Sequence, residues 1–143
     1  MIEDLETFQS SIGTNITLLN DGINTTIQKK IELNDAFSEN KKELLEYIGI
    51  YVDQLSNNGI KIPAIIEKSF ENNTLIFLCE YGGESILNLM SHNALEDTIN
   101  NTNIFDQILK IIKNVQISKI DFDPHPKNYV LLNGVLSFID FTP

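Results

Sequence analysis

The strongest constraint on the fold lies in the tail of the sequence, "DFDPHPKNYVLLNGVLSFIDF" at residues 121–141. An Asn-Gly pair between two apolar runs is the strongest short-range signal for a β-hairpin, because both central residues of its tight turn need a positive φ. Asn133-Gly134 therefore predicts strands over "NYVLL" and "VLSFIDF". Such a hairpin would bring Asn128, before its first strand, close to Asp140 at the end of its second.

Three oxygen-bearing side chains would meet at this hairpin. Asp123 precedes Asn128 by five residues, across a turn stiffened by Pro124 and Pro126, and Asp140 follows twelve residues later. Mg²⁺ prefers oxygen ligands and is usually held by one or two carboxylates together with substrate phosphates. Phosphoryl transfer needs this metal and an acceptor for the proton of the attacking hydroxyl. The pattern predicts that Asn128 and Asp140 hold the metal, and that Asp123 orients or deprotonates the attacking hydroxyl.

Two other metal sites fit the sequence less well. A calcium loop over 121–132 would need Gly at its sixth position and Glu at its twelfth, where the chain has Pro126 and Leu132. A zinc site would need a spaced set of Cys and His ligands, and the two His residues and one Cys show no such spacing. We expect Cys79, inside an apolar strand, to be a packed core residue.

Upstream of the tail, the hydrophobic period changes from two residues to that of a helix. Residues 12–31 are rich in β-branched side chains and predict two strands around a turn at Asp21-Gly22. Residues 38–56 predict an amphipathic helix that ends at Asn57, Asn58 and Gly59. Its apolar stripe consists of Leu44, Ile48, Tyr51, Val52 and Leu55.

The middle of the chain predicts more strands and then helices. "KIPAII" at 61–66 is typical of a short extended piece, and 74–81 predicts a buried strand bounded by Asn72-Asn73 before it and by Gly82-Gly83 after it. Short helical segments are expected over 84–100. A longer helix is expected over 104–115, with Asn103 as its N-cap.

Composition narrows the partners. The 143 residues are 42% hydrophobic, with a net charge of −10, and all ten cations are Lys. A surface of this sign repels phosphate backbones and anionic lipids, so we expect neither a nucleic acid nor a membrane partner. No apolar run reaches the length of a membrane span, and the acidic start lacks the pattern of a secretory signal. With a single Cys, these features predict a cytoplasmic protein.

Two segments of the tail resemble segments of a known protein family. Residues 123–128 (Asp-Pro-His-Pro-Lys-Asn) and 139–141 (Ile-Asp-Phe) resemble the catalytic and metal-binding segments of the protein-kinase-like superfamily. The nearest likeness is to the aminoglycoside phosphotransferase and choline kinase branch, with its Asp-x-His-Pro-x-Asn loop and Ile-Asp-Phe-type segment. The resemblance implies that Asp123 is the catalytic base and that Asn128 and Asp140 are the Mg²⁺ ligands.

The resemblance extends upstream to the residues that would bind ATP. "IGTNITLLNDGINTTIQKK" at 12–30 resembles the family's phosphate-covering strand pair and the strand that carries its nucleotide-binding Lys. Lys29 is the first candidate for this Lys, and Lys30 is the second. The helix over 38–56 would supply the acid that pairs with it, with Glu43 ahead of Glu46.

The stretch "LIFLCEYGGESI" at 75–86 resembles the family's connector between lobes, where backbone groups near Glu80 and Tyr81 would meet the adenine. The likeness spans about residues 10–143. It implies an α+β, two-lobed protein-kinase-like fold, with a small N-terminal sheet lobe and one long helix over 1–80. A partial helical C-lobe ending in a hairpin would occupy 81–143.

The sequence departs from the family pattern in three places. Asp121 stands where the family usually has a His two residues before the catalytic Asp, and the phosphate loop has only Gly13. Family members also continue past the Ile-Asp-Phe segment through further helices. We therefore expect a truncated C-lobe, whose acceptor pocket is missing, is completed by a second copy of the chain or by a partner protein, or is built from residues that do not resemble the family.

Three functions follow as hypotheses. The first is an ATP- and Mg²⁺-dependent phosphotransferase that moves the γ-phosphate to a hydroxyl of a small metabolite or antibiotic-like compound. The second is a non-catalytic, degenerate kinase-like protein that binds nucleotide or acts as a scaffold. The third is an incomplete gene product, which would form an unstable monomer with exposed apolar surface.

Overall fold

The computed structural model describes residues 3–11, 14–34, 39–91 and 103–141, with side chains from Thr14 onward. The protein is α+β, with antiparallel sheets and few helices. It separates into two compact units, each built from two stretches of chain. The first unit contains Met1–Leu45 and Pro63–Tyr81, and the second contains residues 46–62 and 82–143. Within the described ranges, no helix is long and apolar enough to cross a membrane.

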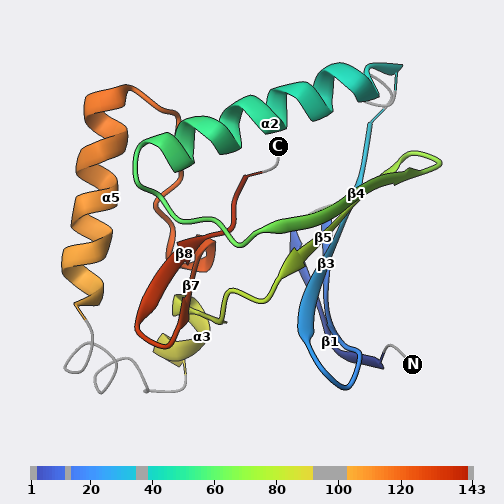
Figure 1. Ribbon diagram of the computed structural model, residues 1–143, viewed down its shortest axis with the longest axis horizontal. Coiled ribbons are helices and arrows are strands. Elements are labelled where there is room, and N and C mark those ends of the chain that lie inside the picture. The colour runs from blue at the N-terminus through green and yellow to red at the C-terminus, as the bar shows by residue number, and fades with distance from the viewer. Residues whose placement is uncertain (1–2, 12–13, 35–38, 92–102, 142–143) are drawn as a thin grey trace. The chain divides into compact units, whose positions relative to one another are not determined.

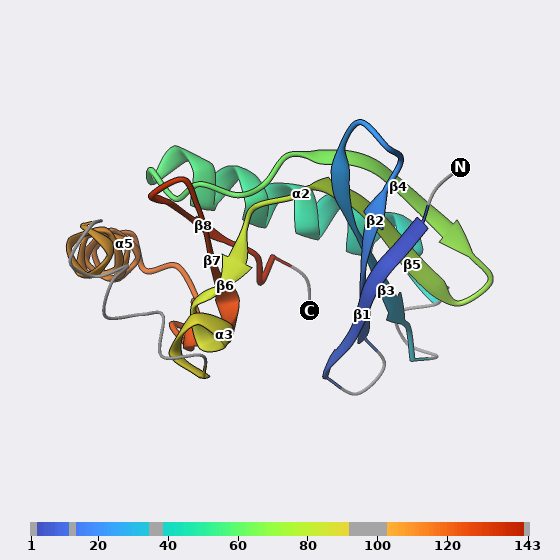
Figure 2. The ribbon, with the colours of Figure 1, turned by 90° about the horizontal axis from the view of Figure 1, so that it is seen from below.

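The first unit is built on a five-stranded antiparallel sheet in the order β1-β2-β3-β5-β4 (Figure 2). Its strands are β1 (Glu3–Ser11), β2 (Thr14–Asn20), β3 (Thr25–Glu32), β4 (Ile65–Glu71) and β5 (Thr74–Glu80). The predicted strand pair within 12–31 and the strand at 74–80 are confirmed. Strand β1 and the length of β4 were not predicted, because polar and charged side chains interrupt the apolar alternation in both.

The turn between β2 and β3 follows from its sequence. Asp21 accepts hydrogen bonds from the N–H groups of Ile23 (2.9 Å) and Asn24 (2.7 Å) through one carboxylate oxygen. Gly22 takes a φ of 89°, which is open to Gly at no steric cost. The backbone hydrogen bonds also lower the pKa of Asp21. The predicted turn at Asp21-Gly22 is therefore confirmed.

Alternation along β5 gives the first unit its core. Leu75, Phe77 and Cys79 are buried on one face of this strand, which lies between β3 and β4, and the residues between them are half-buried. The expectation that Cys79 is a core residue is confirmed, and burial raises the pKa of its thiol to about 11. A sulfur in this state packs as a small hydrophobic group.

Helix α2 (Lys41–Asn57) is the predicted amphipathic helix, and the division between the units falls within it, after Leu45. Leu44, Ile48 and Leu55 of its apolar stripe are buried. The helix ends where Gly59 takes a φ of 76°. Residues 35–38 lie outside the described ranges, so the start predicted at residue 38 is not described.

The second unit pairs a small sheet with helices. The sheet has the antiparallel order β6-β7-β8, and Figure 1 shows α5 beside its β7–β8 hairpin. Its further elements are β6 (Glu84–Ser85), α3 (Ile86–Ser91), α5 (Ile104–Ser118), the 3₁₀ helix η1 (Pro126–Asn128), β7 (Tyr129–Leu132) and β8 (Val135–Phe138). The hairpin is confirmed: Asn133 and Gly134 both have positive φ, 51° and 76°.

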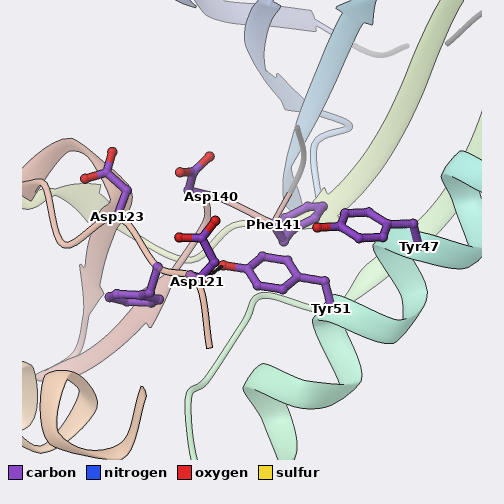
Figure 3. Close-up of a pocket in the computed structure, with 7 residues that line it drawn as sticks. Tyr47, Tyr51, Asp121, Asp123, Asp140 and Phe141 are labelled. Carbon is purple, nitrogen blue, oxygen red and sulfur yellow. Dashed lines mark hydrogen bonds between the residues drawn. The ribbon is translucent and has the colours of Figure 1, made fainter. Parts of the chain in front are cut away.

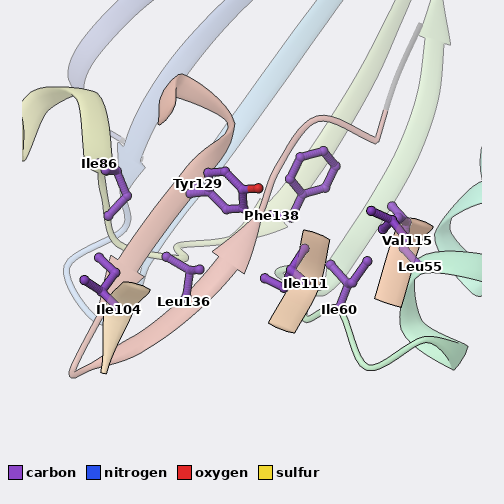
Figure 4. Close-up of a cluster of buried hydrophobic side chains, with 9 residues drawn as sticks. All are labelled: Leu55, Ile60, Ile86, Ile104, Ile111, Val115, Tyr129, Leu136 and Phe138. Atoms are coloured by element: carbon purple, nitrogen blue, oxygen red, sulfur yellow. The ribbon is translucent and has the colours of Figure 1, made fainter. Parts of the chain in front are cut away.

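A single cluster of buried side chains holds these elements together (Figure 4). It draws on α2, the segment after it, α3, α5 and the hairpin: Leu55, Ile60, Ile86, Ile104, Ile111, Val115, Tyr129, Leu136 and Phe138. The carbonyl of Asn58, just after α2, also accepts a hydrogen bond from the Asn114 side chain of α5 (2.9 Å). These contacts explain why residues 46–62, placed with 1–80 from the sequence, belong to the second unit.

Two details of the helices differ from the predictions. Helix α5 continues to Ser118, three residues beyond the predicted end, and closes on Lys119 with a φ of 53°. Asn103 makes no side-chain cap hydrogen bond, because its backbone (φ −74°, ψ 45°) does not have the extended conformation that an N-cap side chain needs. Of the helical segments predicted over 84–100, α3 is described, and residues 92–102 lie outside the described ranges.

Candidate active site

The candidate catalytic loop follows α5 and is anchored by an aromatic side chain. The Phe122 ring stacks on Phe138 of β8, with ring centroids 4.2 Å apart, and meets Tyr129 of β7 at 6.2 Å. The neighbours of Phe122 in the chain, Asp121 and Asp123, are exposed. The anchored ring therefore leaves a carboxylate on each side of it in solvent.

Beyond Asp123 the loop is closed by its own hydrogen bonds. The N–H of His125 donates to Asp123 Oδ1 (3.1 Å), and the N–H of Asn128 donates to the His125 carbonyl (2.9 Å). The Nδ1 atom of His125 accepts from the N–H of Lys127 (3.1 Å) at the start of η1. His125 thus shapes the turn between the two prolines.

Asn128 is the centre of the site. It is 6% exposed, and its side-chain Nδ2 donates to the Asp123 carbonyl (3.1 Å) and to Asp140 Oδ2 (3.3 Å). The carbonyl of Asn128 accepts from the N–H of Ile139 (2.9 Å), the residue before Asp140. The hairpin therefore brings Asp123, Asn128 and Asp140 together, in the arrangement expected from the Asn133-Gly134 turn.

A hollow of about 230 Å³ opens beside these residues. Figure 3 shows Tyr51 projecting from α2 toward Asp121, and Tyr47 projecting from the same helix toward Phe141. The described residues that line this hollow are Tyr47, Tyr51, Asp121, Phe122, Asp123, Asp140 and Phe141. They supply carboxylates and aromatic rings, and none of these described residues is a cation.

The Tyr51 hydroxyl donates to the backbone carbonyl of Asp121 (2.8 Å). Burial, followed by the charges of Asp140 and Asp121, raises the pKa of Tyr51 to about 12. A phenol with this pKa keeps its proton at neutral pH and remains a hydrogen-bond donor. At the start of β7, burial and the charge of Asp123 also raise the pKa of Tyr129 to about 12.

The donor set at the hairpin fits a hard cation in its chemistry. Asp140 offers a carboxylate, and both hydrogen bonds of the Asn128 side chain described above use Nδ2, so its amide oxygen is not engaged by them. A cluster of three or more acidic, His or Cys side chains placed to hold a metal does not occur among the described residues. The set is therefore one carboxylate and one amide, to which substrate phosphates would have to be added.

The structure separates the two lysine candidates. In the β3–β5 register, Lys29 pairs with Phe77 and Ile31 with Leu75, so Lys29 shares the face on which the core residues of β5 lie. Lys30 pairs with Ile76 and lies on the opposite face. Lys29 is also close enough to Cys79 to act on its pKa, in the direction opposite to burial.

The remaining candidates are placed as follows. Glu43 lies in the first turn of α2, within the first unit, while Glu46 lies in the second unit, and both are exposed. Glu80 ends β5, and its N–H donates to the Ala64 carbonyl (2.9 Å). This N–H is therefore already used and is not available to bind an adenine. Tyr81 follows as a half-buried residue. Gly13 lies outside the described residues.

Sequence reasoning missed Tyr47 and Tyr51 as residues of the site. Tyr51 was assigned to the apolar stripe of the helix, and its ring does pack against the core cluster. The signal that could have found the pair is their spacing of four residues, which places two phenols next to each other along one side of a helix.

Comparison with protein-family models and with curated proteins gives no match to this chain. A function is therefore inferred from the geometry of the site and from the motifs that the sequence carries.

Proposed function

We propose that the protein is an ATP- and Mg²⁺-dependent phosphotransferase of the protein-kinase-like fold, acting on a hydroxyl of a small molecule. The observation that carries this proposal is the pair of hydrogen bonds from Asn128 Nδ2 to the Asp123 carbonyl and to Asp140 Oδ2. They tie a candidate base and two candidate metal ligands into one site beside a hollow that could admit an acceptor.

Each residue of the site has a role in this chemistry. Asp123, exposed at the hollow, would accept the proton of the attacking hydroxyl and orient its oxygen. Asp140 and the Asn128 amide oxygen would hold Mg²⁺. Bound Mg²⁺ supplies positive charge that neutralises the phosphate oxygens during transfer.

The first unit supports the nucleotide part of the proposal. Along the chain, the order of elements agrees with the resemblance: the paired strands β2 and β3, with Lys29 on β3, then helix α2, which the division between the units crosses, and then strand β5, which ends at the connector. Lys29 is favoured over Lys30 for contacting phosphate, because Lys29 lies on the face of the core residues. We assign Glu43, in the same unit, as its acidic partner, and Tyr81 with the Glu80 carbonyl as the adenine contact.

A non-catalytic, nucleotide-binding role is the second candidate. It is favoured by Asp121, which stands at the position where the family usually has His. Binding without turnover would distinguish this role from catalysis.

Thermal unfolding with and without Mg²⁺-ATP tests the binding site. A ligand that binds only the folded state stabilises it by about 2.7 kcal/mol at a hundredfold excess over its Kd. We expect a Mg²⁺-dependent rise in Tm for the wild type, lost in Asp140→Ala. Asp53→Ala, an exposed residue of α2 outside the hollow, is the matched control and should keep the rise. An equal rise in Asp140→Ala would contradict the metal assignment.

Asp123→Ala separates binding from catalysis. The variant should keep the Mg²⁺-ATP rise in Tm, because Asp123 is not assigned as a metal ligand. It should lose phosphate transfer to a hydroxyl acceptor, measured as ADP formed. Loss of both together would indicate that the Asp123 side chain serves the structure of the loop.

A further inference from the structure

The loop that carries Asp123 has few backbone hydrogen-bond donors. Pro124 and Pro126 have no N–H, so the turn has fewer hydrogen bonds with which to fix itself. After Asp123, the loop is tied by Asn128 and by the His125 N–H. Before Asp123, the described anchors are the Phe122 ring and the hydrogen bond from Tyr51 to the Asp121 carbonyl.

Tyr51 is well placed to act as such an anchor. Its ring packs against the buried cluster of the second unit, while its hydroxyl reaches the hollow and lies 2.8 Å from the Asp121 oxygen. A carbonyl can only accept, so Tyr51 must donate, and the raised pKa keeps the phenol protonated at neutral pH. A ring held by packing fixes the position of its hydroxyl more closely than a flexible side chain in solvent could.

We propose that Tyr51 is the positioning residue of the catalytic loop, holding the peptide at Asp121 so that the Asp123 carboxylate lies at the hollow. In this role Tyr51 acts through Asp123 and not through the reacting atoms. Its effect on catalysis rests on the proposed phosphotransferase function. Its effect on the order of the loop does not, which allows the two to be tested separately.

Tyr51→Phe removes the hydroxyl and keeps the ring, and Tyr47→Phe is its matched control. Tyr47 lies one helical turn earlier, lines the same hollow and is 63% exposed. The first readout is amide hydrogen exchange at His125 and Asn128, whose N–H groups are bonded inside the loop. We expect exchange at both to be faster by about tenfold in Tyr51→Phe, since one hydrogen bond no longer restrains opening. Exchange at these two amides in Tyr47→Phe should match that in the wild type.

The second readout is the split between kcat and KM. Loss of a positioning contact should lower kcat by about tenfold to a hundredfold, because small misplacement of a catalytic group is costly. The KM for ATP should stay within about twofold, because nucleotide contacts are unchanged. A merely structural role would instead lower the amount of folded enzyme and leave kcat per folded molecule unchanged.

The outcomes are distinguishable. If exchange at His125 and Asn128 is the same in Tyr51→Phe and Tyr47→Phe, the positioning role is overturned, whatever the protein catalyses. If exchange rises but the wild type transfers no phosphate, the phosphotransferase function fails while the anchor stands. Should Tyr51→Phe not fold, the wild type itself decides. A slowly exchanging Tyr51 hydroxyl proton with a cross peak to the Phe122 amide supports the anchor, and its absence overturns it.

Discussion

At the scale of single residues, the sharpest steric constraint lies at Gly83, beside the site hairpin. Gly83 takes a φ of 111°, and a Cβ there would overlap the Leu131 carbonyl and lie 2.7 Å from the Leu132 nitrogen. Both neighbours are backbone atoms of β7, which cannot move aside without breaking the sheet. The sequence predicted a boundary at Gly82-Gly83, but not that one backbone passes directly against another there.

We predict that Gly83→Ala destabilises the second unit by more than about 2 kcal/mol, from overlap and backbone strain together. Gly49→Ala is the control: Gly49 lies inside α2, and a Cβ there would have no neighbour within 4 Å. This second change should stabilise by about 0.5–1 kcal/mol, because Ala costs less chain entropy in a helix. Urea unfolding of both variants measures the difference, and equal effects would contradict the close approach of the two backbones.

At the scale of elements, one side chain joins α5 to the hairpin that carries the site. Gln107 donates from Nε2 to the Gly134 carbonyl (3.1 Å), and its Oε1 accepts from the N–H of Leu136 (3.1 Å). A side-chain amide has both a donor and an acceptor, so the one Gln side chain can bond the Gly134 carbonyl and the Leu136 N–H at the same time. The turn that sets the spacing of Asn128 and Asp140 is therefore supported from a separate helix.

We predict that Gln107→Ala destabilises the second unit by about 1–3 kcal/mol, because two half-buried backbone groups lose their partner. Gln116→Ala, at an exposed position of the same helix, should change stability by less than about 0.5 kcal/mol. Chemical unfolding monitored by circular dichroism measures both. Indistinguishable midpoints would mean that the Gln107 amide does not support the hairpin in solution.

The elements were predictable to the extent that local rules decide them. Asn133-Gly134 predicted the hairpin from the φ values that its turn needs, and the stripe through Leu44, Ile48 and Leu55 predicted α2. The role of Gln107 could not be predicted, because its partners are 27 and 29 residues away and are backbone groups of no particular sequence. The predicted N-cap at Asn103 was wrong, although Asn is a favourable residue type for this position, because its backbone does not adopt the cap conformation.

At the scale of the whole molecule, the candidate residues divide between the two units. Asp123, Asn128 and Asp140 belong to the second unit, and Lys29, Glu43, Glu80 and Tyr81 belong to the first. From β2 onward, the order of elements along the chain was predictable from periodicity and turn residues, whereas β1 was not predicted. That residues 46–62 belong to the second unit was not predictable. It depends on which core Leu55 and Ile60 join, and from the sequence alone these two side chains could pack in the core of either unit.

The central claim, that Asn128 and Asp140 hold a divalent cation next to Asp123, can be measured without knowing the acceptor. Mn²⁺ is added in small amounts to the ¹⁵N-labelled protein with ATP, and the loss of NMR signals to paramagnetic broadening is followed. We predict that the Asn128 side-chain amide and the backbone amides of Asp123 and Asp140 broaden first. Broadening spread evenly over the acidic surface, or centred on other residues, would contradict the site.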